Sequence, residues 1–192
     1  LVFILCLLPL TGGYHMNLMK AESPGPSVSK LVPKVQSTAK ILYTIYIILT
    51  IVEIIFLLIG KMPLFDTLCL SFGTAGTGGF GIKNDSIASY STYNQVVITV
   101  FMILFGINFN AYYLLLTKKV MQAAKNEEVR YYLGIIGLAI VAIAINTREM
   151  FTSFGRAFQQ AAFQVGSIIT TTGYATTDFN VWPVFSKTIL VI

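Results

Sequence analysis

The sequence predicts an all-α membrane protein built from repeated helix–loop–helix units. Of its 192 residues, 55% are hydrophobic and only 11% are charged, whereas soluble domains carry about 25% charged residues. Long apolar segments alternate with short charged linkers, and two glycine- and threonine-rich loops interrupt the apolar pattern 94 residues apart. We therefore expect a multi-pass protein in a lipid bilayer.

The first forty residues predict the end of one spanning helix and a polar linker. Residues 1–19 are mostly apolar and are interpreted as the end of the second helix of a first repeat. Residues 20–40 carry four lysines around a Pro-Gly-Pro turn and form a linker. Because both ends of the chain fall within apolar runs, we expect the sequence to be a fragment.

Residues 41–116 predict one complete repeat. Residues 41–59 match the length of about 20 residues that crosses a bilayer. After Pro63, which suits a first helical turn, residues 64–75 are too short to span and predict a re-entrant helix. The glycine-rich loop 76–81 and a polar stretch then lead to a second spanning helix at 95–116. Three residues interrupt the apolar character of that helix: Gly106, Asn108 and Asn110.

The same order then begins again and is cut short. A charged linker at 117–130 precedes a helix at 131–147. Thr152 or Ser153 could cap a short helix at 154–168. The threonine–glycine loop 170–175 and the start of a helix at 183–192 complete the third repeat as far as the chain extends.

The two units correspond weakly in residue identity. Gly79-Phe80 corresponds to Gly173-Tyr174 at an offset of 94, as does Asp66 to Gln160. Gly73 and Gly166 match only at 93, so we expect the two short helices to differ by one residue in register. The linkers 20–40 and 117–130 hold eight of the 13 basic residues, which places them on the cytoplasmic side. Both loops then face outward.

The loops predict a cation filter. Non-helical backbone is tolerated at membrane depth only when it is buried in protein or lines a water-filled cavity, and carbonyls there can replace the hydration shell of an ion. The carbonyl end of the preceding short helix favours a cation, and the aromatic residue after each central glycine is expected to wedge its loop from behind. The expected ligands are the backbone carbonyls of Thr77, Gly78, Gly79, Phe80, Thr171, Thr172, Gly173 and Tyr174.

Two other classes of function remain as alternatives. A secondary carrier with broken helices would present helix N-termini to its solute. A membrane enzyme or scaffold would need a polar cluster, and the sequence offers Glu53 and scattered amides. A phosphate-binding loop is excluded, because no Gly-Lys-Ser/Thr follows the glycines. We expect no enzymatic activity, no organic cofactor and no nucleic-acid partner.

Several polar or aromatic residues have more than one interpretation. Glu53 could be functional or a neutral structural group. Asn108 and Asn110 could bond between helices or line a vestibule. Asp85 and Asp178 could attract cations or brace the loops, and Trp182 is expected at a membrane interface.

Both loops resemble the potassium-channel filter Thr-Val-Gly-Tyr-Gly, and the whole chain resembles the TrkH/KtrB superfamily of bacterial potassium-uptake proteins. The resemblance rests on residues 20–26, 77–80, 106–109 and 170–179 and on Trp182-Pro183. It implies four non-identical repeats related to potassium channels around one path for potassium ions across the bacterial cell membrane. It also implies a homodimer and a cytosolic nucleotide-binding regulatory subunit of the TrkA/KtrA type. Departures from the channel motif at Gly78, Thr172 and Ala175 imply looser discrimination against sodium.

Overall fold

A computed structural model describes residues 35–116 and 126–191, except for the side chains of 35–40, 110 and 116. The helix end predicted at 1–19 and most of both linkers lie outside these ranges. The chain divides into two compact units, residues 1–47 and 48–192. Of the first unit only the beginning of one helix is described, and both glycine loops lie in the second unit.

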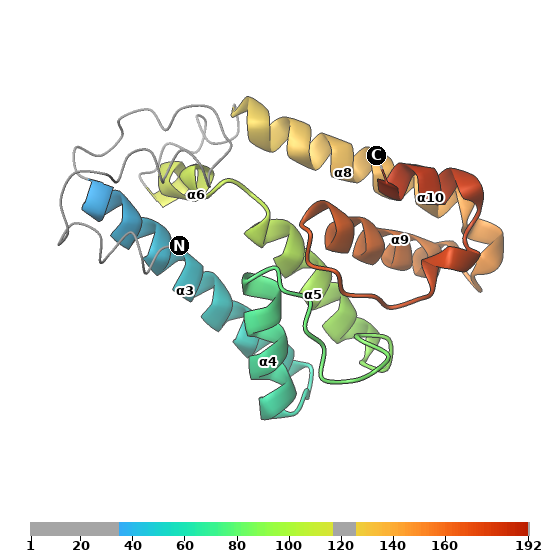
Figure 1. The fold of residues 1–192 in the computed structure, drawn as a ribbon, viewed down its shortest axis with the longest axis horizontal. Helices are drawn as coiled ribbons and strands as arrows, with labels where there is room; N and C mark the ends of the chain where they lie inside the picture. The colour runs from blue at the N-terminus through green and yellow to red at the C-terminus, as the bar shows by residue number, and fades with distance from the viewer. Residues whose placement is uncertain (1–34, 117–125, 192) are drawn as a thin grey trace. The chain divides into compact units, whose positions relative to one another are not determined.

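The described residues are helical and contain no strand (Figure 1). This confirms the predicted all-α class. The elements are α3 (Val35–Ile59), α4 (Leu64–Ala75), α5 (Thr92–Phe105), α6 (Phe109–Leu116), α8 (Glu127–Asn146), η2 (Arg148–Met150), α9 (Phe154–Ile169), η3 (Phe179–Val181) and α10 (Val184–Val191).

The short helices begin and end close to their expected positions. Helix α4 has the predicted bounds, and α9 extends one residue beyond its predicted end. Helix α8 begins four residues earlier than expected, because the Asn126 side chain accepts a hydrogen bond from the Glu128 N–H at 3.1 Å. Glu127 and Glu128 in its first turn also suit the positive end of the helix dipole.

The helix predicted at 95–116 is wrong as one continuous element. Helix α5 ends at Phe105, and α6 begins at Phe109. A Cβ at Gly106 would lie 2.2 Å from the Tyr132 hydroxyl, so α8 approaches the backbone too closely for a side chain there. The Tyr132 hydroxyl donates to the Ile103 carbonyl at 3.2 Å, and the Tyr112 hydroxyl donates to that of Leu104 at 2.7 Å. The last carbonyls of α5 are therefore satisfied despite the break.

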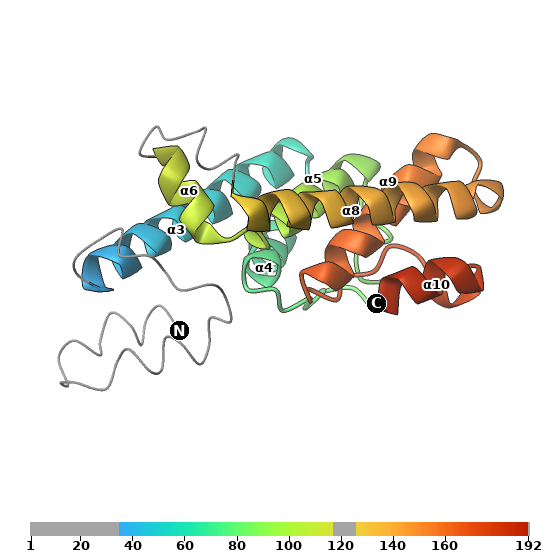
Figure 2. The ribbon, with the colours of Figure 1, turned by 90° about the horizontal axis from the view of Figure 1, so that it is seen from above.

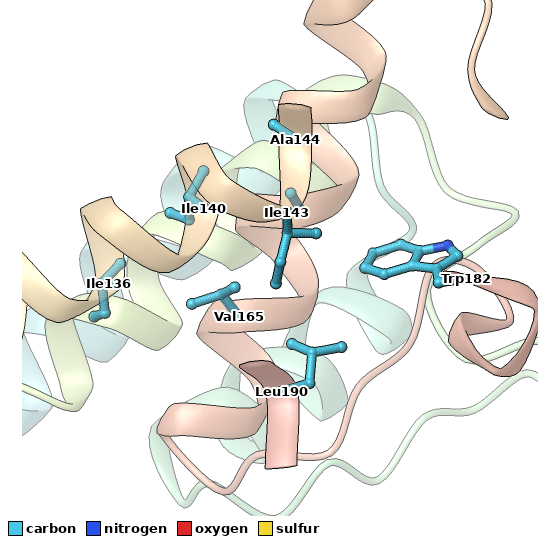
Figure 3. Packing of buried hydrophobic residues seen from close by; sticks show 8 residues of the cluster. Ile136, Ile140, Ile143, Ala144, Val165, Trp182 and Leu190 are labelled. Atoms are coloured by element: carbon cyan, nitrogen blue, oxygen red, sulfur yellow. The ribbon is translucent and has the colours of Figure 1, made fainter. Parts of the chain in front are cut away.

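The C-terminal helices surround a hydrophobic core. Helices α8 and α9 run side by side, and α10 packs on both (Figures 1 and 2). Ile136, Ile140 and Ile143 lie on one face of α8 at helical spacing and meet Val165 of α9 (Figure 3). Trp182 is 3% exposed in this cluster and packs edge-on against the Phe151 ring. The Trp182 ring is therefore covered by the protein itself, and its expected position at a membrane interface stays a prediction.

Two helices are long and apolar enough to cross a membrane, residues 41–59 of α3 and all of α8, among the described residues. Both leave large apolar side chains uncovered, and packing within the chain does not account for these faces. They are Ile51, Ile55, Ile59, Ile135, Leu138 and Ile145. Helix α5 packs between α4 and α9 and so links the two short helices that precede the glycine loops.

Candidate functional site: two glycine loops

Helices α4 and α9 end in the same turn. Thr77 N–H donates to the Thr74 carbonyl at 3.1 Å, and Gly78 N–H reaches back to that of Gly73 at 2.8 Å. This pair of hydrogen bonds is a Schellman motif, in which the first residue past the helix adopts a left-handed conformation that usually requires glycine. Here that residue is Thr77, with φ of 48°.

The second loop repeats this turn at a constant offset of 94 residues. Thr171 N–H donates to the Ile168 carbonyl, Thr172 N–H donates to that of Ser167, and Thr171 has φ of 57°. Ser167 therefore corresponds to Gly73, and Phe72 corresponds to Gly166. The expected one-residue shift between the short helices is wrong, because the match of Gly73 to Gly166 was one of residue type and not of backbone position.

The central glycines are the next left-handed positions. Gly79 has φ of 63° and Gly173 has φ of 86°, whereas Gly78 and Thr172 between the left-handed residues do not have positive φ. A Cβ on Gly79 would lie 1.9 Å from the Thr172 carbonyl oxygen. The first loop (residues 76–81) and the second loop (residues 170–175) thus touch where Gly79 meets Thr172.

Tyr174 fastens the second loop to the preceding repeat. Its side chain is 1% exposed, and its hydroxyl donates to the Leu70 carbonyl of α4 at 3.3 Å. A Cβ on Gly73 would lie 2.2 Å from the Tyr174 hydroxyl oxygen, so Gly73 provides the space into which Tyr174 fits. This agrees with the expectation that the aromatic residue wedges its loop from behind.

The segment after the first loop holds the second loop from the other side. Ile87 N–H donates to the Ala175 carbonyl at 3.0 Å, and Ala175 N–H donates to the Ser86 hydroxyl at 3.2 Å. The Gln95 amide in turn donates to the carbonyls of Ile87, Ala88 and Tyr90. The second loop therefore rests on a segment that α5 holds in place.

Asp66 and Gln160, which correspond in the two repeats, each brace the segment after their own loop. The Tyr90 hydroxyl donates to the Asp66 carboxylate at 2.8 Å, and the Thr176 hydroxyl donates to the Gln160 side-chain oxygen. Burial, together with the Asp66 carboxylate, raises the pKa of Tyr90. Tyr90 therefore remains a neutral donor throughout the physiological pH range.

Seven of the eight predicted carbonyls have no hydrogen-bond donor among the described residues: those of Thr77, Gly78, Gly79, Phe80, Thr171, Thr172 and Gly173. The Tyr174 carbonyl is the exception, because it accepts from the Ser167 hydroxyl at 2.6 Å. The Phe80 carbonyl lies 3.5 Å from where a Gly73 Cβ would stand, on the side of its own short helix. Of the expected ligands, only the Tyr174 carbonyl is therefore already engaged within the described residues.

Phe80 differs from Tyr174 in a second respect. Its side chain is 80% exposed, and its ring lies over Gly78, where a Cβ would be 2.9 Å from it. Among the described residues, Phe80 therefore does not wedge the first loop from behind as expected.

The remaining predicted residues separate into buried and peripheral groups. Glu53 is fully buried. The Asn108 amide donates to the Glu128 carboxylate at 2.9 Å, which links the α5–α6 break to α8, whereas the side chain of Asn110 lies outside the described part. Asp178 accepts hydrogen bonds from Asn180 and caps η3, and Asp85 is exposed. No group of three or more metal-ligating side chains occurs within the described ranges.

Sequence reasoning missed Ser86, Gln95 and Ser167. All three are common polar residues that no motif marks. Their contacts join residues that are far apart in the sequence or that do not share a helical spacing. The constant 94-residue offset offered one usable signal, because it aligns Ser167 with Gly73 at the end of a short helix.

Several known proteins are similar to this chain in sequence. Residues 1–138 match the family model described as cation transport protein TrkH. The chain belongs to the TrkH family. It is 30% identical to the Trk system potassium uptake protein TrkH of Salmonella typhimurium over 100% of this chain. The corresponding identity to TrkH of Vibrio parahaemolyticus is 34% and that to TrkG of Escherichia coli is 29%, again over 100% of this chain.

This TrkH-family chain superposes on the crystal structure of the potassium transporter TrkH from Vibrio parahaemolyticus with a TM-score of 0.79 at 28% identity. The superposed region covers 99% of this chain and 40% of the crystallised chain. The chain spans about 41% of the length of the curated TrkH relatives it matches. The second loop lies beyond the residues that match the family model, but it falls within the alignments to these relatives. The resemblance in sequence is thus confirmed, and the chain is a membrane protein of a cation-transport family.

Proposed function

We propose that this chain forms part of a potassium-uptake pathway in which each glycine loop supplies one part of a cation filter. The observation that carries the proposal is the match between the loops. Each has a threonine and a glycine in left-handed conformations, and each has at least three consecutive carbonyls without a donor among the described residues. Unpaired carbonyls at membrane depth are costly unless they face water or an ion.

The charge of the site favours a cation. Helices α4 and α9 both direct their C-terminal ends at the loops, and these ends carry partial negative charge. A carrier for anions would present N-terminal ends instead. The seven proposed ligands are the carbonyls of Thr77, Gly78, Gly79, Phe80, Thr171, Thr172 and Gly173, with K⁺ as the transported ion and no organic cofactor.

Two loops do not enclose an ion, so we infer that further repeats complete the path. Tyr174 of the third repeat docks on α4 of the second. By the same relation, exposed Phe80 would dock on the short helix of a repeat that precedes this one. The chain's share of its relatives' length leaves room for such repeats.

The names of the relatives extend the proposal to partners. They are described as members of a Trk system, which implies more than one component. We propose that the full-length protein is a homodimer that works with a cytosolic nucleotide-binding subunit of the TrkA/KtrA type.

Replacing the central glycines tests the filter. In Gly79→Ala, the new Cβ would collide with the Thr172 carbonyl, whereas in Gly173→Ala it meets open space and adds only the cost of a left-handed alanine. We expect Gly79→Ala to abolish potassium-selective uptake and Gly173→Ala to weaken selectivity over sodium. Flux of ⁸⁶Rb⁺ and ²²Na⁺ into liposomes containing the full-length protein measures both effects.

Gly134→Ala is the matched control, because this glycine lies in α8 with nothing within 4 Å of a new Cβ. It should leave flux and selectivity unchanged. Wild-type selectivity in both loop variants would refute the filter.

A further inference from the structure

Glu53 of α3 is a buried carboxyl that the proposed filter does not use. It is 0% exposed, and neither of its oxygens has a hydrogen-bond partner among the described residues. Glu53 also forms no ion pair with a basic side chain in the part of the chain that is described. An unpaired carboxylate is very costly in a low-dielectric interior, so such a group is normally neutral or functional.

The neighbours of Glu53 place it directly behind the second loop. Thr74 of α4 lies beside both the Glu53 carboxyl and the Tyr174 ring hydroxyl. Thr74 is 0% exposed and Tyr174 is 1% exposed, so the three side chains form one buried polar group. Cys69 of α4 and Tyr90 are the other titratable side chains close to Tyr174.

The hydrogen bonds already made in this group show whether Thr74 can still donate a hydrogen bond or can only accept one. The Thr74 hydroxyl donates to the Leu70 carbonyl at 2.8 Å, and the Tyr174 hydroxyl donates to the same carbonyl at 3.3 Å. The Thr74 oxygen therefore has only lone pairs left to offer. A protonated carboxyl could donate to that oxygen, whereas an ionised carboxylate would find no donor there.

We propose that Glu53 is a positioning residue for the second glycine loop, with its protonated carboxyl donating to Thr74. Together with the Leu70 carbonyl, the Glu53–Thr74 pair then fixes the surface on which Tyr174 rests. Because Tyr174 follows Gly173 directly, a shift of its ring moves the ligand carbonyls of the loop. This inference rests on the proposed filter, since it assigns Glu53 a role in ion selectivity.

Substitutions at Glu53 and Thr74 show whether Glu53 acts as a neutral hydrogen-bond donor or as a charged carboxylate. Glu53→Gln keeps a donor of nearly the same shape and should preserve selectivity for rubidium over sodium within about twofold. Glu53→Leu and Thr74→Val each remove one partner and should lower that selectivity about tenfold, the scale of one lost buried hydrogen bond. The double variant should be no worse than either single one, because both break the same interaction. Glu149→Gln, at an exposed carboxylate of η2, is the matched control.

Loss of selectivity in Glu53→Gln equal to that in Glu53→Leu would overturn the proposal, because it would show that the charged form is needed. Unchanged selectivity in Glu53→Leu would overturn it as well. Infrared difference spectroscopy at neutral pH gives a readout that does not depend on transport. The carbonyl band of a protonated carboxylic acid should be present in the wild type and absent from Glu53→Gln. If wild-type liposomes carry neither ion, the proposed function fails, and this band still tests the state of Glu53.

Discussion

Threonine occupies the left-handed position after both short helices, although glycine would fit there without strain. A β-branched residue at positive φ is unusual, and such a conformation costs about 1–3 kcal/mol. Thr77 and Thr171 bear this cost at corresponding positions, beside carbonyls that have no donor in the described structure. We interpret the repeated strain as a sign that the threonine side chain is needed at the proposed filter.

Replacing Thr171 with glycine tests this interpretation. Thr171→Gly should raise thermal stability, because the left-handed conformation no longer carries a Cβ, and it should lower selectivity for rubidium over sodium. Lys61→Gly is a control, because Lys61 has φ of 57° and lies outside the loops. It should stabilise the protein to a similar extent without altering transport. Equal transport in both variants would mean that the threonine is not required.

At the scale of elements, the break between α5 and α6 depends on a helix that is distant in sequence. Gly106 lies against Tyr132 of α8, and a Cβ placed on Gly106 would also lie 2.9 Å from the methyl group of Thr170, where the second loop begins. The break, α8 and the second loop therefore meet at one glycine. A change in the position of α8 would directly displace the start of that loop.

A double-mutant cycle tests this contact. Gly106→Ala should destabilise the protein, because its Cβ would overlap the Tyr132 hydroxyl. Tyr132→Phe removes that oxygen and should recover part of the loss in the double variant, so the two effects are not additive. Thermal unfolding in detergent measures the cycle, with Gly137→Ala as the control at an open site. Strict additivity would contradict the contact.

The elements that sequence predicts well are those with local signals. Pro63 and the glycines after Ala75 mark both ends of α4, and its bounds coincide with the prediction. The α5–α6 break was not predictable as an end of α5, because a lone glycine in an apolar run is compatible with a helix and the deciding contact comes from Tyr132. The candidate loops were found from composition, whereas the bond from Tyr174 to Leu70 joins residues 104 positions apart and has no local signal.

For the whole molecule, the distribution of basic residues predicts the orientation in the membrane. The linkers around 20–40 and 117–130 should face the cytoplasm, and the segment after the first loop should face outward. With Cys6 and Cys69 replaced by serine, a cysteine at exposed Asn84 should react with a membrane-impermeant maleimide in intact cells. A cysteine at exposed Glu127 should react only after permeabilisation. The reverse pattern of labelling would contradict this topology.

The docking of Tyr174 on α4 also has a consequence for biosynthesis. The surface that receives the Tyr174 ring, formed by Leu70 and Gly73, leaves the ribosome about a hundred residues before the ring itself. During synthesis the N-terminal parts of a chain emerge first. We therefore expect the second loop to reach its final shape only after α4 has formed the surface that receives Tyr174.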